Sequence, residues 1–247
     1  MATGVVFRPQ LPPEELRGAV EAAEAAGVEE LWLWEDCFLE GGLTTAAAAL
    51  AWSARITVGI GLLPVPFRNP ALAAMELATL ARLFPGRLTV ALGHGVQDWM
   101  RQVGAAVDSP LTLLREHTTA VRSLLAGETV DVRGRYVSLD RVALDWPPAT
   151  PPRLLLGARG PKTIALAGEV SDGVLLDSVT DLDVVRRARE LVGDAQVYAY
   201  TPVEPGTSRE AVLDWVGRLQ GAGADTVVLQ GTDEHPGHVP LIDVLTA

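Results

Sequence analysis

Short apolar runs alternate with longer amphipathic stretches along the whole of the 247-residue chain. Runs rich in Val, Ile and Leu are typical of strands buried on both faces, whereas apolar residues three and four positions apart predict helices. Strands are predicted at 3–7, 30–34, 56–62, 87–92, 153–156, 173–177, 195–201 and 225–229. Helices are predicted at 12–26, 43–53, 70–84, 110–126, 161–168 and 182–192, with a seventh opening at 207–210 and a short last one from about 239.

Several residue types mark the ends of these elements. Pro12 and Gly27 flank the first helix, since proline favours a first turn and glycine a helix end. Thr207 and Glu210 have the spacing of a capping box. In the helix at 70–84, the apolar face is predicted from four residues, Leu72, Met75, Leu80 and Leu83.

Eight alternating strand and helix units predict an α/β fold in which the chain, residues 1–247, forms a single (β/α)8 TIM barrel. A β-hairpin is predicted as an insertion after the fourth helix, from residues 129–132 and 136–139 around Arg133-Gly134-Arg135. The alternative is an open doubly wound sheet. That fold usually carries a Gly-rich turn after its first strand, and this chain has none there.

Charge and composition narrow the possible partners. The formal net charge is -11, which argues against nucleic acid and anionic membranes. The only cysteine, Cys37, allows no internal disulfide and fits a reducing cytosol, so a cytoplasmic location is expected. Residues 1–11 lack the apolar run of a signal peptide, and no segment offers the ~18 apolar residues of a membrane span.

Two Gly-x-Gly turns follow consecutive predicted strands, at residues 59–61 and 93–95. A dinucleotide fingerprint needs a third glycine three residues later, where this chain has Pro64 and Asp98. The glycines Gly61, Gly93 and Gly95 are therefore predicted to let a ligand approach the backbone at the carboxyl end of a barrel.

The segment Gly157-Ala158-Arg159-Gly160-Pro161-Lys162 is the strongest ligand signal. Two glycines open the backbone, a proline starts a helix, and the free N–H groups of a helix start attract anions. Arg159 and Lys162 add positive charge in an acidic chain. This predicts a phosphate site, while the alternative is an ordinary turn between a strand and a helix.

Three residues at strand ends are candidates for proton transfer. His94 lies between two glycines and could donate a proton or bond a ligand carbonyl, or it could be held by the rim backbone. Glu35 and Asp36 are adjacent carboxylates, of which only one should face the barrel mouth. The alternative role for either is a helix cap or an ion-paired rim residue.

Other reactive residues are weaker candidates. Cys37 is expected to be structural, and Trp34 and Trp99 could form a platform for a planar ligand. His235 and His238 are separated by proline and glycine, which prevents the helical geometry of a zinc motif, so no metal site is predicted. The sequence has no nucleophile elbow, P-loop or Cys-x-x-Cys.

An ordered set of segments resembles the bacterial luciferase-like superfamily of flavin- and deazaflavin-dependent oxidoreductases. Residues 27–36 resemble its second strand, "G-F-x-x-L-W" with an acidic end. Its third strand and helix resemble residues 56–61 and 69–73, and residues 84–95 resemble "G-R-x-x-x-G-x-G-x-G". Residues 157–162 with 171–174 resemble its cofactor-phosphate segment, so the resemblance covers most of 1–180.

The resemblance implies a barrel that holds a flavin-like cofactor at its carboxyl end. It also implies a non-proline cis peptide in the third strand, near Gly61–Leu62, behind the cofactor ring. Members often have Asp-His after strand two where this chain has Glu35-Asp36, so no role for that histidine carries over. The strand end Gly-x-Gly-Leu-Leu-Pro and residues 157–162 look more like the branch that uses coenzyme F420, with FMN as the alternative.

The function expected from this resemblance is hydride transfer between coenzyme F420 and a small organic substrate, in a homodimer. His94 or Glu35 would handle the proton. The alternatives are an FMN-dependent monooxygenase and a non-catalytic flavin-binding relative. The residues expected to hold the cofactor are Asp36, Gly61, Leu62, Gly93, Gly95, Gly157, Ala158, Arg159 and Gly160.

Overall fold

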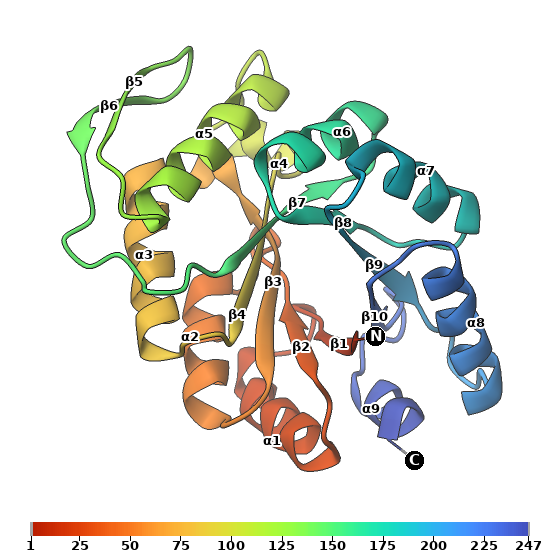
Figure 1. The fold of residues 1–247 in the computed structure, drawn as a ribbon. Helices are drawn as coiled ribbons and strands as arrows, with labels where there is room; N and C mark the ends of the chain where they lie inside the picture. Colours follow the sequence, from red (N-terminus) through yellow and green to blue (C-terminus); the bar gives the residue numbers. More distant parts are fainter. Residues whose placement is uncertain (1, 247) are drawn as a thin grey trace.

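The computed structural model describes residues 2–246 and shows a closed barrel of eight parallel strands (Figure 1). Their order around the barrel is β1-β10-β9-β8-β7-β4-β3-β2. The strands are β1 (Ala2–Phe7), β2 (Glu30–Leu33), β3 (Thr57–Pro64), β4 (Leu88–Gly93), β7 (Arg153–Ala158), β8 (Gly173–Leu176), β9 (Gln196–Pro202) and β10 (Thr226–Gln230). The predicted TIM barrel is confirmed.

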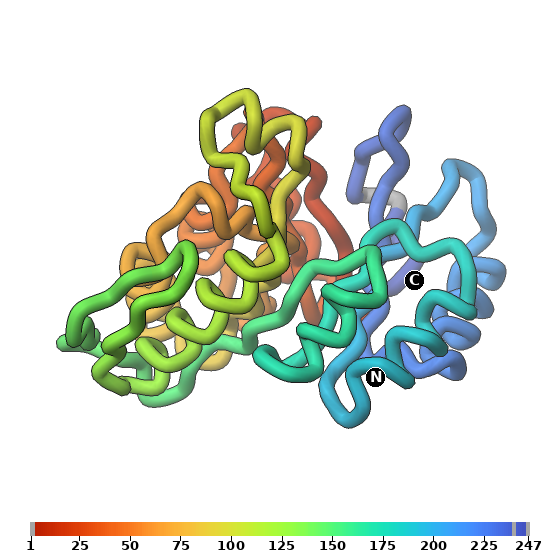
Figure 2. Tube along the Cα trace, turned by 90° about the horizontal axis from the view of Figure 1, so that it is seen from above, coloured from red at the N-terminus to blue at the C-terminus, as the bar shows by residue number. Residues whose placement is uncertain are grey.

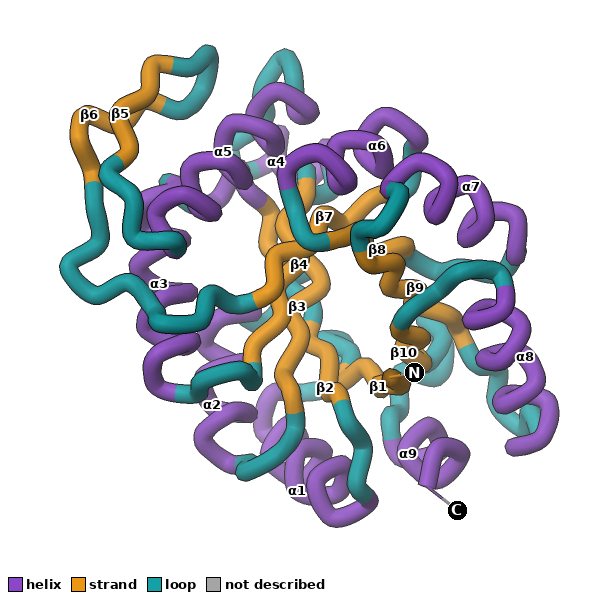
Figure 3. The backbone as a smooth tube through the Cα atoms, viewed as in Figure 1, coloured by secondary structure: helices purple, strands orange, loops and turns teal. Residues whose placement is uncertain are grey.

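Helices surround the barrel on its outer side (Figure 3). They are α1 (Leu16–Ala26), α2 (Gly42–Trp52), α3 (Pro70–Leu83), α4 (Gln97–Gln102), α5 (Pro110–Leu125), α6 (Pro161–Val170), α7 (Leu182–Val192), α8 (Arg209–Gly221) and α9 (Val239–Thr246). Short 3-10 turns η1 (Pro13–Glu15) and η2 (Val65–Phe67) precede α1 and α3. None of the helices in the described part of the chain combines the length and hydropathy needed to cross a bilayer.

The core has two shells. Apolar side chains between strands and helices form the outer one. The inner shell fills the barrel itself with eight buried residues: Val6, Trp32, Ala91, Leu155, Leu175, Tyr198, Tyr200 and Val228. Aromatic rings occupy much of this interior, so the barrel is a packed core and not a pore.

All eight strands run in the same direction, so their carboxyl ends meet at one rim. In Figure 2, the loop after β4 (yellow) and the loop after β10 (dark blue) rise on the same side of the barrel. Ligand-binding loops are expected at this carboxyl end, and the opposite amino end carries the strand starts.

The apolar face predicted for α3 is wrong for three of its four residues. Leu72, Met75 and Leu83 are 46%, 56% and 65% exposed, and only Leu80 is buried. The barrel side of α3 is formed mainly by alanines, Ala73, Ala74, Ala78 and Ala81, together with Leu77 and Leu80. Alanine lets a helix pack closely on the sheet, so size complementarity selected this face over the one with the largest side chains.

Residues between α5 and β7 lie outside the barrel wall (Figure 1). There β5 (Val130–Arg133) pairs antiparallel with β6 (Ser138–Val142). The turn between them is held by Glu116 of α5, whose carboxylate accepts backbone N–H bonds from Arg135, Tyr136 and Val137 at 2.8–2.9 Å. The short helix α4 was not predicted from the sequence.

Candidate active site at the carboxyl end of the barrel

Three glycines at neighbouring strand ends, Gly61, Gly93 and Gly157, allow side chains to pack directly against the backbone at the barrel mouth. A Cβ atom at Gly61 would overlap the Tyr200 hydroxyl, and one at Gly93 or Gly157 would overlap the Leu62 side chain. Gly95 has φ +67°, a conformation that glycine adopts most easily. The structure therefore brings together three predicted site glycines from β3, β4 and β7, and Gly95 follows in the loop after β4.

The Gly61–Leu62 peptide bond is cis, as the resemblance implied. The pairing of β3 with β4 shifts register between Gly61 and Leu63, so Leu62 stands out of the ladder. Its side chain lies against Gly93 and Gly157 and packs on the inner barrel shell. A second non-proline cis bond joins Cys37 and Phe38 in the loop after β2.

Beneath this backbone, two aromatic side chains carry neighbouring polar atoms that make no hydrogen bond of normal geometry. The Trp34 and Tyr200 rings stack with centroids 6.0 Å apart. Trp34 Nε1 and the Tyr200 hydroxyl are buried and make no hydrogen bond of normal geometry within residues 2–246. Such atoms are costly to leave unpaired, so they mark a place where a polar ligand atom would be stabilised. Burial raises the pKa of Tyr200 well above its usual value, so the hydroxyl keeps its proton.

Arg8, which the sequence analysis missed, lies at the base of the mouth. It is buried, its guanidinium lies 4.8 Å from the Trp34 ring centroid, and it donates to the Gly231 carbonyl at 2.8 Å. It also pairs with Asp233. A charged residue directly after an apolar first strand was the available signal, but β1 has no glycine turn to draw attention to it.

The two adjacent carboxylates have different environments. The charged groups that act on Asp36 are Arg8, Asp177 and Asp233, which follow β1, β8 and β10 across the barrel mouth. Burial raises the pKa of Asp36, Arg8 opposes this shift, and the two aspartates add to it. Asp36 is therefore the carboxylate that faces the mouth.

Glu35 instead faces the surrounding helices. Its carboxylate accepts the Gly42 amide at the start of α2 at 2.8 Å and forms a two-pronged ion pair with Arg68, one contact of which is 2.8 Å. Arg68 also pairs with Glu76 of α3. Because this carboxylate is buried and fully bonded, the geometry supports the alternative role as an ion-paired helix cap over the predicted catalytic one.

His94 connects β4 with the start of α6. Its Nε2 lies 3.0 Å from the Thr163 hydroxyl, and Nδ1 is buried without a hydrogen bond of normal geometry in the described chain. Burial lowers the pKa of His94, and the nearby Pro110 backbone opposes part of this shift. The ring is therefore neutral near pH 7, with the Pro110 backbone close to it.

The predicted phosphate segment forms the end of β7 and the first turn of α6. Gly160 is the N-cap residue and no side chain caps the helix. Arg159 is 82% exposed and pairs with Asp177, with its Nε at 2.9 Å. Exposed ion pairs contribute little, so Arg159 could exchange Asp177 for a ligand phosphate.

The remaining candidates lie apart from this group or are held elsewhere. Burial raises the pKa of the free thiol of Cys37, which makes it a weak nucleophile. His238 is buried against Phe7, whereas His235 is exposed. Among residues 2–246, no group of three or more histidine, cysteine, aspartate and glutamate side chains is arranged to hold a metal ion.

The fold defines a TIM-barrel protein, with a candidate ligand site at the glycine-lined carboxyl end of the barrel. The family model described as luciferase-like monooxygenase matches residues 2–232. The chain belongs to this family.

Sequence relatives include a methanopterin reductase and an F420-dependent dehydrogenase. The 5,10-methylenetetrahydromethanopterin reductase of Methanolobus tindarius is 29% identical over 205 residues, covering 83% of this chain and 62% of that protein. The F420-dependent glucose-6-phosphate dehydrogenase of Mycobacterium avium (strain 104) is 33% identical over 187 residues, covering 68% and 54%. The chain therefore spans little more than half the length of these relatives.

Solved structures share the fold at lower identity. The coenzyme F420 dependent tetrahydromethanopterin reductase from Methanopyrus kandleri superposes with a TM-score of 0.86 at 18% identity, covering 99% of this chain and 97% of that one. An F420-dependent secondary alcohol dehydrogenase in complex with an F420-acetone adduct gives 0.85 at 19% identity, covering 100% and 98%. The oxygenating constituent of 3,6-diketocamphane monooxygenase from Pseudomonas putida, in complex with FMN, gives 0.71 at 16%, covering 91% and 80%.

Proposed function

We propose that the protein is an oxidoreductase that uses coenzyme F420 to transfer hydride to or from a small organic substrate. The observation that carries this proposal is the glycine-lined mouth, in which a Cβ at Gly61, Gly93 or Gly157 would overlap a neighbouring side chain. The unpaired polar atoms of Trp34 and Tyr200 beneath it suit a heteroaromatic ring with polar edges. Bound there, the deazaflavin ring would supply the hydride chemistry.

The residues that would hold such a cofactor come from three strand ends. Gly61, Leu62 and Gly93 would lie under the ring, with Gly95 beside them. The phosphate would bind at the start of α6, where the helix has no side-chain cap. The backbone of that segment, Gly157, Ala158 and Gly160, would surround it, and Arg159 would supply the charge that offsets a phosphate.

We assign the proton to Asp36. It faces the mouth, and burial raises its pKa, so it retains a proton to higher pH than an ordinary aspartate and can act as an acid. Glu35, through its ion pair with Arg68, positions the loop that carries Asp36. His94, neutral and bonded to Thr163, remains the second candidate, with Nδ1 available for a proton.

The choice of F420 over FMN rests on the relatives, since both named sequence relatives above belong to F420 or methanopterin chemistry. Titration of the purified protein with each cofactor, followed by the change in cofactor fluorescence, tests this directly. Tight F420 binding without FMN binding is expected. Bound FMN together with oxygen uptake by the reduced protein would instead identify a flavin monooxygenase.

The role of Asp36 is tested by its pH profile. In the direction in which the substrate is reduced, Asp36 must donate a proton, so the rate should fall as pH rises through the raised pKa of Asp36. Asp36→Asn should remove this limb of the profile while F420 affinity changes little. A limb that persists in Asp36→Asn and disappears in His94→Gln would transfer the role to His94.

We further propose that two copies associate through α3. The exposed residues Leu72, Met75 and Leu83 are separated by three and eight positions on one helix face, and Trp146, 71% exposed, lies beside the last turn under Arg82. Exposed apolar patches of this kind mark protein interfaces. Sedimentation should show a dimer that Met75→Glu dissociates, while a monomeric wild-type protein would exclude this interface.

A further inference from the structure

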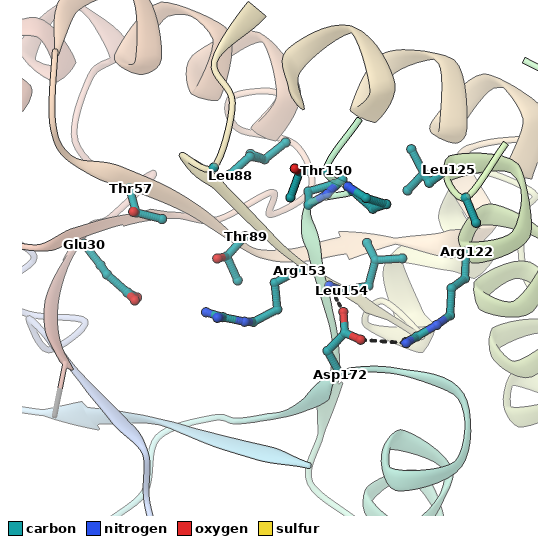
Figure 4. A pocket seen from close by; sticks show the side chains of 14 residues that line it. Glu30, Thr57, Leu88, Thr89, Arg122, Leu125, Thr150, Arg153, Leu154 and Asp172 are labelled. Carbon is teal, nitrogen blue, oxygen red and sulfur yellow. Dashed lines mark hydrogen bonds and ion pairs between the residues drawn. The ribbon is translucent and has the colours of Figure 1, made fainter. Parts of the chain in front are cut away.

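A cavity of about 670 Å³ opens at the amino end of the barrel, on the side opposite the proposed cofactor site (Figure 4). Its walls come from the starts of β2, β3, β4 and β7 and from the last turns of α5. The volume lies within the range of small-molecule sites. The family resemblance and the carboxyl-end chemistry leave this cavity without a role.

Two opposite charges face this cavity. Glu30 is only 7% exposed, and its Oε2 accepts a hydrogen bond from Trp32 Nε1 at 2.8 Å. Arg153 donates to the Tyr198 hydroxyl at 2.6 Å. Figure 4 shows both side chains in the same half of the cavity, with Thr57 and Thr89 near them.

Glu30 and Arg153 attract one another but form no ion pair, and within residues 2–246 neither has another ion-pair partner. Burial raises the pKa of Glu30, while the Trp32 hydrogen bond and the charge of Arg153 oppose this shift. A buried carboxylate without a close cation is costly. A ligand that placed a cation beside Glu30 would therefore be stabilised.

The other charges of the cavity are already satisfied. Arg122 and Asp172 pair at 2.8 Å, and the second oxygen of Asp172 accepts the Leu154 amide at 2.9 Å. Leu88, Leu125 and Leu154 add apolar surface to the lining of the cavity. The charges without an ion-pair partner are thus one anion and one cation that line the same cavity, next to an apolar surface.

We propose that this amino-end cavity binds a small zwitterion, an α-amino acid with an apolar side chain. Its ammonium group bonds the Glu30 carboxylate and its carboxylate bonds the Arg153 guanidinium, whose planar donors match that geometry. Its side chain packs on the leucine wall. An anion would meet Glu30, a cation would meet Arg153, and an uncharged polyol would leave both charges unpaired.

Calorimetric titration of the protein without cofactor tests this inference, using L-leucine as the probe. Two matched analogues each lack one charge: 4-methylpentanoate has no ammonium group, and 3-methylbutylamine has no carboxylate. L-leucine should bind at least tenfold more tightly than either, since each lost charge-assisted contact costs about that factor. Equal binding of all three, no L-leucine binding, or tighter binding of glycerol would overturn the proposal.

Variants locate the site. Glu30→Gln and Arg153→Gln should each weaken L-leucine binding about tenfold or more, and the matched control Arg209→Gln, on an exposed position of α8, should not. Unchanged binding in both cavity variants would place the ligand elsewhere and overturn the proposal. Where a variant does not fold, the analogue series on the unaltered protein decides. Since no cofactor is present, a negative result leaves the carboxyl-end proposal intact.

Discussion

The two ends of the barrel treat their buried polar atoms in opposite ways. At the amino end, Trp32 Nε1 donates to Glu30 and the Tyr198 hydroxyl accepts from Arg153. At the carboxyl end, Trp34 and Tyr200 lie two residues further along the chain than Trp32 and Tyr198. Among the described residues, Trp34 Nε1 and the Tyr200 hydroxyl face each other without a hydrogen bond of normal geometry and have no charged partner. The inner aromatic column is continuous, with Trp32 and Tyr200 ring centroids 5.5 Å apart.

This difference indicates which end of the barrel is adapted to bind a ligand. A fold selected only for stability would give both pairs of polar atoms hydrogen bonds of normal geometry. The carboxyl end does not, and it places charged groups and glycines around these atoms. The amino end is satisfied internally except for two opposite charges, which suits an effector-sized ligand more than a reacting cofactor.

The largest expected effect is the loss of stability when Glu35, which faces the helices, is replaced, compared with replacement of Asp36, which faces the barrel mouth. Glu35→Gln should lower the free energy of unfolding by about 3 kcal/mol, because it leaves Arg68 in a mostly buried position with a weaker partner. Denaturant unfolding measures this loss. Asp36→Asn is the matched control and should change stability far less, since it removes a charge that burial already disfavours.

If Glu35→Gln were as stable as the wild type but had lost turnover, the assignment of the two carboxylates would reverse. Glu35 would then be the reacting group and its ion pair would be incidental. The comparison of the two ends would survive, but the proposed proton path would not.

A second effect is the pH dependence of stability that comes from His117, which contacts the backbone of Arg68. His117 is buried and its Nε2 lies 3.1 Å from the Arg68 carbonyl. Burial lowers the pKa of His117 to about 4, the Arg68 carbonyl opposes the shift, and the Arg68 charge adds to it. Below pH 6.5 the unfolded chain gains a proton that the folded protein refuses until about pH 4, so about 3 kcal/mol of stability is lost between these values as pH falls.

Urea unfolding at a series of pH values from 7 to 4 checks this, with His117→Gln as the comparison. The variant should be less stable than the wild type at pH 7 and should lose less stability on acidification. Parallel curves for the two proteins would show that His117 does not carry the acid sensitivity of this region.

The sequence predicted the barrel and most of its element bounds, because buried parallel strands and amphipathic helices have distinct periods. It also predicted the glycines of the mouth, since their spacing is local. It did not separate Glu35 from Asp36, because β2 ends at Leu33 and the alternation of a strand no longer applies beyond it. Nor could it find the pairing of Glu35 with Arg68, which joins loops 33 residues apart.

The face of α3 shows the same limit in another form. Hydrophobicity alone favours Leu72, Met75 and Leu83 as the buried stripe, yet the structure buries the alanines. Which stripe fits the sheet depends on the distance between helix and strands, and that distance is a property of the assembled fold. The exposed stripe is then available for a second copy of the chain.

A third effect tests whether the gap at the carboxyl end needs its glycines. Gly61→Ala should cost about 1–3 kcal/mol of stability, because the new methyl group overlaps the Tyr200 hydroxyl and Leu175. It should also abolish F420 binding, as the floor of the mouth would shift. Gly217→Ala, an exposed position inside α8 with no atom near its Cβ, is the control and should be neutral or stabilising by up to about 1 kcal/mol.

Binding without loss in Gly61→Ala would mean that the cofactor does not approach this strand. The difference in hydrogen bonding between the two ends of the barrel would then be a consequence of core packing and not of a ligand. The proposed cofactor site would have to lie closer to β8 and β10.

The smallest effect is expected at the phosphate segment, where the chain supplies its own competing anion. Replacing Arg159 with alanine removes a guanidinium that is 82% exposed and already paired with Asp177. The net loss of F420 affinity should therefore be only about 1 kcal/mol, below the 1–3 kcal/mol of an uncompeted charged contact. Asp177→Asn should act in the opposite direction, because it frees Arg159 and removes a negative charge beside the phosphate. Fluorescence titration of both variants at low and at high salt measures these changes in F420 affinity. The difference in affinity between the two variants should become smaller at high salt, because salt screens the exposed charges.

If Arg159→Ala bound F420 as tightly as the wild type and Asp177→Asn gained nothing, the phosphate would depend on the backbone N–H groups of α6 alone.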